Sequence, residues 1–251
     1  MINPKASIFL ASLAVLGLFQ LSYLQPQFFY WNLVLINLIL ISVLRSLPKL
    51  KFSSYQYWNF LILPFLFLNS SLVYFALLSG KVLIQIVIVF SVVFVHYYLR
   101  QIYFYLRDDS KGSALINISS CGTILILFFS SVSLYGLRIN LQLPIWLLML
   151  GILIVVSLVT YQALWINDIK LKLNLFYVLI IDLLVLELAW SLFFLSFGYQ
   201  ILGVILTICY YIIIGLTKFN LKNALDRKRL KFYLGFGLTS IFLILLTARI
   251  L

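Results

Sequence analysis

Residues 174–196 read NLFYVLIIDLLVLELAWSLFFLS, and this stretch decides the class of fold. Apart from Asp182 and Glu187 it carries no charge, and it is long enough to cross a bilayer, which takes about 20 mostly apolar residues. It lacks the regular apolar–polar alternation of a half-buried strand. Because a helix satisfies its own backbone hydrogen bonds in lipid, we expect a membrane-spanning helix here.

Stretches of the same kind fill nearly all of the 251-residue chain, of which 65% is hydrophobic and 10% charged. Soluble domains carry about 25% charged residues. The predicted spans are residues 6–24, 28–45, 57–79, 82–106, 113–136, 144–166, 174–196, 199–217 and 231–249. We therefore expect an all-α, polytopic transmembrane helical bundle of about nine spans. Residues 1–251 would form a single integral membrane domain, with no soluble domain.

The first span resembles a secretory signal peptide, because Lys5 precedes an apolar run. No small-residue cleavage site follows, since the run ends at residues 21–26 as LSYLQP. We therefore expect this span to be retained.

Basic residues are distributed unevenly between the two sides that nine spans define. Of the 18 Lys and Arg residues, only Lys81, Arg138 and Arg249 fall on one side. The other side carries Lys5, Arg45, Lys49, Lys51, Arg100, Arg107, Lys111, Lys170, Lys172, Lys218, Lys222, Arg227, Lys228, Arg229 and Lys231. Short loops rich in Lys and Arg stay in the cytoplasm. The amino end is thus predicted to be cytoplasmic and the carboxyl end outside.

The formal net charge of +12 raises the question of an acidic partner. Because the charges sit in short links between apolar runs, we expect anionic lipid headgroups on the cytoplasmic side and no nucleic acid. The densest group of candidate headgroup contacts is Lys218, Lys222, Arg227, Lys228, Arg229 and Lys231. The alternative is that these charges serve topology alone.

Asp182 and Glu187 are the candidates for chemistry within the membrane. An ionisable group at mid-bilayer costs on the order of 3 kcal/mol on insertion scales, so two on one helix need an explanation. Their spacing of five residues places them about 140° apart around a helix. Each is therefore expected to have its own partner on a different neighbouring helix, or to be protonated.

Depth suggests partners for Asp182, which lies roughly 12 Å from the cytoplasmic end of its span at about 1.5 Å per residue. In the fourth span His96 lies roughly 15 Å deep and Arg100 roughly 9 Å deep, and Asn37 in the second span lies roughly 12 Å deep. A pairing of Asp182 with Arg100 or His96 is therefore allowed by level.

Glu187, at roughly 20 Å, is level with Asn69 of the third span. One interpretation makes Asp182, Glu187, His96 and Arg100 a group that handles protons or cations. The other makes them polar contacts that order the bundle, or in the case of Arg100 a side chain that reaches the cytoplasmic surface.

Catalytic and metal-binding patterns are missing from the sequence. Cys121 and Cys209 lie in apolar runs outside any Cys-x-x-Cys or Cys/His cluster, so we expect two buried small side chains. With a single His, neither a metal nor another cofactor is expected. There is no H-E-x-x-H and no Gly-x-Ser-x-Gly, which disfavours an enzyme.

The run from Glu187 to Leu195, ELAWSLFFL, together with Tyr210 and Tyr211, resembles bacterial multi-pass membrane proteins grouped as a domain of unknown function. This resemblance implies no activity. We expect a multi-pass protein of a bacterial cytoplasmic membrane, with a leading hypothesis of a non-catalytic partner or assembly component, alone or as a homo-oligomer. The alternative is a small transporter or a proton- or cation-conducting protein that uses Asp182 and Glu187. A lipid-acting enzyme comes third.

Overall fold

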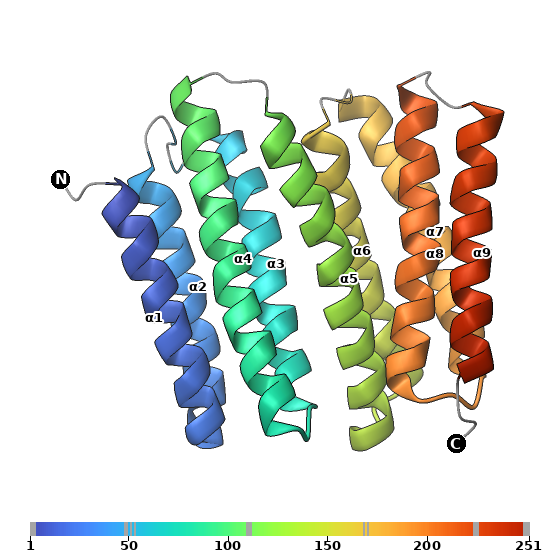
Figure 1. Ribbon diagram of the computed structural model, residues 1–251, viewed down its shortest axis with the longest axis horizontal. Helices are drawn as coiled ribbons and strands as arrows, with labels where there is room; N and C mark the ends of the chain where they lie inside the picture. The colour runs from blue at the N-terminus through green and yellow to red at the C-terminus, as the bar shows by residue number, and fades with distance from the viewer. Residues whose placement is uncertain are drawn as a thin grey trace. The chain divides into compact units, whose positions relative to one another are not determined.

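The structure, a computed structural model, describes residues 4–47, 50, 52, 54–108, 112–167, 169, 171–222 and 226–247. Over these residues the chain forms nine α-helices and one short 3-10 helix (Figure 1). They are α1 (Pro4–Leu24), η1 (Pro26–Phe28), α2 (Phe29–Ser46), α3 (Tyr55–Ala76), α4 (Lys81–Asp108), α5 (Ser113–Leu141), α6 (Ile145–Trp165), α7 (Leu171–Phe193), α8 (Tyr199–Leu221) and α9 (Arg227–Thr247). Each of these nine α-helices contains a stretch long and apolar enough to cross a membrane. The all-helical prediction is confirmed for the described residues.

Helix ends fall within a few residues of the predicted ones, with α5 as the main exception. This helix continues past residue 136 to Leu141. It ends where Gln142 adopts a left-handed backbone with φ of 52°, a conformation that commonly terminates helices. The next helix, α6, begins directly after Pro144, which has the extended backbone of an N-cap residue.

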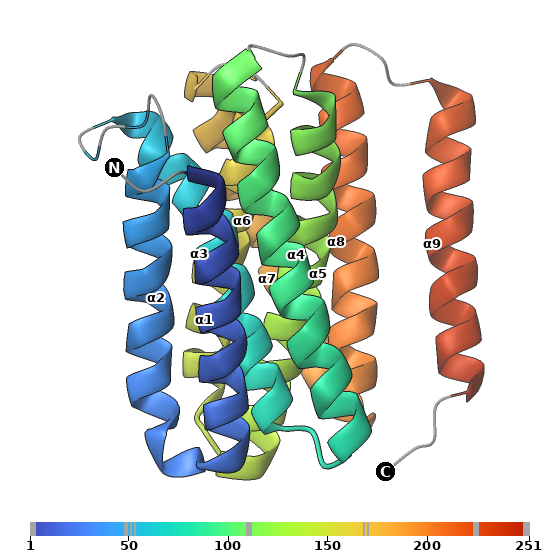
Figure 2. The ribbon, with the colours of Figure 1, turned by 60° about the vertical axis from the view of Figure 1, so that its left-hand side comes forward.

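The chain divides within α5 into two compact units, Met1–Gly122 and Thr123–Leu251, which we call the first and the second unit. In the first unit, α1 packs against α2 and α4, and α3 packs against the same two helices (Figure 2). The hydroxyl of Tyr57 donates to the carbonyl of Ile41, and Asn69 bonds Asn37. Residue numbers fall along α2 from 41 to 37 as they rise along α3 from 57 to 69, so the two helices are antiparallel.

In the second unit, α6 packs on α7, α7 on α8 and α8 on α9. Gly203 of α8 lies against α5 so closely that an added Cβ would come within 2.8 Å of the Val132 nitrogen and 2.9 Å of its Cα. Ser131 Oγ donates to the Gly203 carbonyl over 3.2 Å at the same place. Glycine is therefore required for this backbone approach, as is common between membrane helices.

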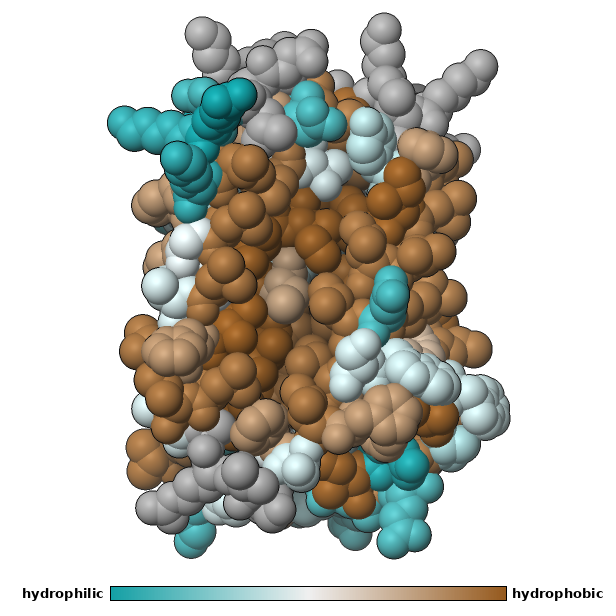
Figure 3. All heavy atoms as spheres, turned by 90° about the vertical axis from the view of Figure 1, so that its right-hand side faces the viewer, coloured by the Kyte–Doolittle hydropathy of each residue, from teal (hydrophilic) through white to brown (hydrophobic). Residues whose placement is uncertain are grey.

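The outer helix α9 is mostly exposed. Gly237 is its one buried residue among those described, and Tyr233 stacks on Tyr211 of α8 with ring centroids 5.3 Å apart. Figure 3 views the molecule from the side where this helix lies in Figure 1. It shows a broad hydrophobic band between hydrophilic residues at both ends, the pattern expected of a surface that faces lipid.

Candidate functional site: polar groups within the helices

Asp182 lies on the buried face of α7, with only 4% of its surface exposed. Ser157 of α6 donates a hydrogen bond of 2.5 Å to its Oδ2 atom. The other carboxyl oxygen, Oδ1, is buried and has no hydrogen-bond partner among the described residues. One half of this carboxyl group is therefore satisfied by a neighbouring helix, and the other half is open.

A second polar contact lies beside Asp182. The hydroxyl of Tyr210 on α8 lies 3.1 Å from Oγ1 of Thr160 on α6, and it interacts electrostatically with Asp182. Helices α6, α7 and α8 each contribute one part of this cluster. Sequence reasoning singled out neither Ser157 nor Thr160 as partners. Their spacing of three residues in an otherwise apolar span, which puts them on one helix face, was the available signal.

Glu187 lies on the exposed side of α7. Its neighbours on that side are apolar, with Leu183 65% and Trp190 49% exposed. Among the described residues, none forms a hydrogen bond or ion pair with its carboxyl group. From the ends of the apolar stretch Leu175–Phe193, Glu187 is about 18 Å and about 9 Å away along the helix axis.

His96 and Arg100 belong to α4 of the first unit, whereas Asp182 belongs to the second. His96 Nδ1 lies 3.0 Å from Oγ of Ser12 on α1. The guanidinium group of Arg100 is exposed and sits 5.5 Å from the centroid of the Phe104 ring. The hydrogen bonds of His96 and of Asp182 are thus made within their own units, and the pairing of Asp182 with His96 or Arg100 stays a prediction.

Asn37 and Asn69 bond each other, with distances of 3.1 and 3.0 Å between each Nδ2 and the opposite Oδ1. The depths predicted for Asn37 and Asn69, about 8 Å apart, did not indicate this contact. Side chains on a helix tilt toward its amino end. On antiparallel helices the two side chains tilt toward each other along the axis, which closes much of that gap.

The basic segment Lys218–Lys231 is more helical than predicted, because α8 continues to Leu221 and α9 begins at Arg227. Lys222 Nζ donates to Asn167 Oδ1 over 2.8 Å, which joins the ends of α8 and α6. Arg229 lies 4.8 Å from the Phe219 ring centroid. Exposed at the start of α9 are Arg227, Lys228, Arg229 and Lys231. Their contact with lipid headgroups stays a prediction.

The described residues contain no group of three His, Cys, Asp or Glu side chains that could hold a metal ion. Cys209 is partly buried, but Cys121 is exposed, so the prediction of a buried Cys121 is wrong. A span that is apolar all round does not reveal which side faces the core.

One comparison with known proteins gave a match. The model of the family described as "Protein of unknown function (DUF5656)" matches residues 6–248. The resemblance read from the seventh and eighth spans is thereby confirmed, and it extends over nearly the whole chain. No curated protein and no solved structure matches the chain.

Proposed function

This chain belongs to the DUF5656 family, and we propose that it is a multi-pass protein of a bacterial cytoplasmic membrane that acts as a non-catalytic partner of other membrane proteins. The observation that carries this proposal is the exposed position of Glu187 within an apolar stretch of α7. On that face no described residue donates a hydrogen bond to the carboxyl group.

A charged side chain in lipid is energetically unfavourable. A charged side chain near the centre of a membrane helix costs about 2.5–3.5 kcal/mol on insertion scales. Asp182 reduces this cost by packing against Ser157, but Glu187 makes no such contact with a described residue. We infer that a polar donor on a transmembrane helix of another protein meets Glu187 on the face that Leu183 and Trp190 flank.

The packing of α9 supports the same role. This helix packs against α8, yet most of its residues remain exposed. Gly235 has no atom within 4 Å of the position where a Cβ would stand. Small residues allow close approach of a further helix in a membrane. The second unit therefore has a second helix face that a partner can cover.

The proposed orientation places the amino end in the cytoplasm, in agreement with the bias of Lys and Arg. Reporter fusions after residues 110 and 251 test it. The first fusion is expected to report the cytoplasm and the second the outside. Fusions that report the same side would contradict an odd number of spans between them and the proposed topology.

Photo-crosslinking in native membranes tests the partner role. A photoreactive residue is placed at Leu183 or Trp190, and a matched control is placed at Leu150 on α6, which is 47% exposed. Adducts are expected at the two α7 positions but not at the control. Mass spectrometry of each adduct is expected to identify a transmembrane helix with a polar side chain at the crosslink.

A substitution at Glu187 makes this test specific. Glu187→Leu is expected to abolish the adducts, whereas Glu187→Gln, which keeps hydrogen-bonding capacity, is expected to retain them. Adducts with a second copy of the chain would make the partner a homo-oligomer. Equal labelling at Leu150, or adducts unaffected by Glu187→Leu, would overturn the proposal.

Asp182 favours a second candidate function, transfer of protons through the second unit. Its buried Oδ1 atom, beside Tyr210 and Thr160, accepts no hydrogen bond from a described residue. Reconstituted vesicles with an internal pH indicator test this candidate. A proton flux that Asp182→Asn removes would support it, and a flux equal to that of empty vesicles would exclude it.

A further inference from the structure

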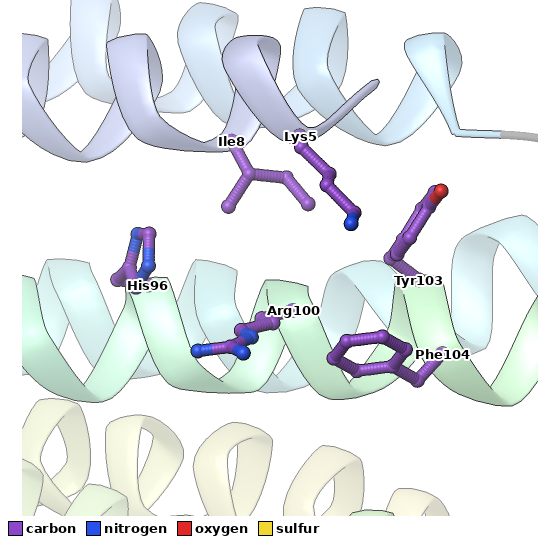
Figure 4. A pocket seen from close by; sticks show the side chains of 6 residues that line it. All are labelled: Lys5, Ile8, His96, Arg100, Tyr103 and Phe104. Carbon is purple, nitrogen blue, oxygen red and sulfur yellow. The ribbon is translucent and has the colours of Figure 1, made fainter. Parts of the chain in front are cut away.

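A small cavity lies between α1 and α4 in the first unit (Figure 4). Its volume is about 210 Å³, and its lining consists of Lys5, Ile8, His96, Arg100, Tyr103 and Phe104. Three of these six side chains carry basic nitrogen atoms, and none is a carboxylate. In Figure 4 the Lys5 side chain extends from α1 toward α4, where Arg100 and Tyr103 lie. The cavity is therefore suited to an anion.

The hydrogen bonds around His96 show which of its nitrogens remains for a ligand. Ser12 Oγ donates its one proton to the Ile8 carbonyl over 2.9 Å. Its 3.0 Å contact with His96 Nδ1 therefore requires the ring nitrogen to donate. Nε2 takes no part in this contact, and in the neutral ring it is an acceptor, so the donors for an anion come from the other side chains of the lining.

Tyr103 adds a further donor. Its hydroxyl oxygen accepts a hydrogen bond of 3.2 Å from Nη1 of Arg107, which leaves its own proton available. The planar guanidinium group of Arg100 matches the geometry of a phosphate, and the Lys5 ammonium group binds one as a point charge. Together these groups form a set of donors typical of phosphate recognition.

An apolar surface groove continues from this cavity, first between α1 and α4 and then along α4 alone. Its first part has a volume of about 270 Å³ and is lined by Phe9, Ser12, Leu13, Leu16, Val92, Val93 and His96. A wider, open part of about 730 Å³ follows on α4 from Val93 to Lys81. His96 is common to the cavity and the first part, and Val93 to both parts of the groove. From His96 to Val82 the groove runs about 21 Å along α4. The hydrocarbon core of a bilayer is about 30 Å thick, so the groove covers most of that thickness.

We propose that α1 and α4 hold one anionic phospholipid, with its phosphate in the basic cavity and an acyl chain in the groove. A neutral lipid would add no negative charge to a lining that contains basic side chains and no carboxylate, and a soluble anion would leave the groove unused. The proposal rests on the membrane location proposed above but not on the partner role. It concerns different residues from the basic segment Lys218–Lys231.

Native mass spectrometry of the full-length, delipidated protein in detergent tests this site. The probes are phosphatidylglycerol, phosphatidylcholine with the same acyl chains, and inorganic phosphate. Wild type is expected to retain one phosphatidylglycerol molecule in preference to phosphatidylcholine. Arg100→Gln is expected to weaken this binding about tenfold, which corresponds to the loss of one charge-assisted hydrogen bond. Arg45→Gln removes an exposed charge of α2 that does not line the cavity; it is the matched control and is expected to change nothing.

A groove variant separates the lipid from a free anion. Val93→Trp places a large side chain on the exposed wall of the groove and is expected to weaken binding of long-chain phosphatidylglycerol but not of its short-chain analogue. Displacement of the lipid by millimolar inorganic phosphate would overturn the choice of a lipid. Equal binding by Arg100→Gln and wild type would overturn the site itself. Neither result bears on crosslinking at Leu183, so the two proposals fail separately.

Discussion

In the first unit, two pairs of amide side chains on neighbouring helices bond each other in both directions, beside the Tyr57 hydroxyl that donates to the Ile41 carbonyl. In the second unit, hydroxyl groups donate to a carboxylate or a carbonyl of a neighbouring helix. Gln20 of α1 and Gln85 of α4 exchange hydrogen bonds of 2.6 and 3.3 Å, as Asn37 and Asn69 do between α2 and α3. A reciprocal amide pair uses a donor and an acceptor from each partner, so it leaves little to attract a ligand. Such pairs fix the alignment of helices.

The described residues of the second unit do not close the surroundings of Asp182 in this way. Ser157 bonds one oxygen of Asp182, and no described residue bonds the other. Close helix packing here depends instead on Gly203 against α5 and on the Tyr135 hydroxyl, which donates to the Ala189 carbonyl over 2.9 Å. The amide pairs of the first unit therefore serve to align helices. The carboxyl groups of Asp182 and Glu187 on α7 can still accept further hydrogen bonds.

The largest effect is expected from filling the close contact in the second unit. Gly203→Val adds a side chain where the backbone of α5 already lies, and overpacking of this kind costs about 3 kcal/mol. Unfolding in dodecyl sulfate, followed by tryptophan fluorescence, measures the loss. Gly17→Val in α1 is the matched control, because nothing lies within 4 Å of its Cβ position. It is expected to change the unfolding free energy by less than about 0.5 kcal/mol. Equal effects would contradict the close approach.

Breaking an amide pair tests the closed arrangement of the first unit. Asn69→Leu leaves Asn37 without its reciprocal partner and is expected to cost about 1–2 kcal/mol in the same unfolding assay. Replacing both residues by Leu removes both polar groups, and the double variant is expected to be closer to wild type than the single one. A double variant that loses the sum of two single losses would indicate that each Asn acts alone.

A double-mutant cycle measures the hydroxyl–carboxyl contact of the second unit. The coupling free energy between Ser157→Ala and Asp182→Leu is expected to be about 1 kcal/mol, within the range of hydrogen bonds between membrane helices. In the control cycle, Ser240→Ala takes the place of Ser157→Ala, because the Ser240 hydroxyl donates to the Phe236 carbonyl of its own helix. Its coupling with Asp182 is expected to be zero. A zero value for the first cycle would remove Ser157 as the partner of Asp182.

The sequence alone was sufficient to place the helices, because each span is recognised as a run of about 20 apolar residues. It was also sufficient to separate Asp182 from Glu187, since five residues turn a helix by about 140°. The sequence could not predict whether Asp182 or Glu187 points toward the core, because α7 is apolar on all sides and has no amphipathic pattern.

Neighbours of the polar residues were harder to predict. Counting residues from the membrane surface ignores the tilt of each side chain toward the amino end of its helix. Asn37 and Asn69 were therefore assigned to different levels, although they bond each other. Ser157 was overlooked because the sequence does not show which helix faces it, although its spacing from Thr160 places both hydroxyls on one side of α6.

The smallest effects are expected where helix ends are joined in the presence of water. In the second unit Lys222 donates to Asn167, and in the first unit the hydroxyls of Ser7 and Ser46 lie 3.0 Å apart. Both contacts are exposed, so water replaces either partner readily. Lys222→Gln and Ser7→Ala are each expected to lower the unfolding free energy by less than about 0.5 kcal/mol. A loss above about 1 kcal/mol for Lys222→Gln alone would mean that this end of the second unit is shielded from water. The basic segment would then stabilise α6 and α8 in addition to its predicted role in topology.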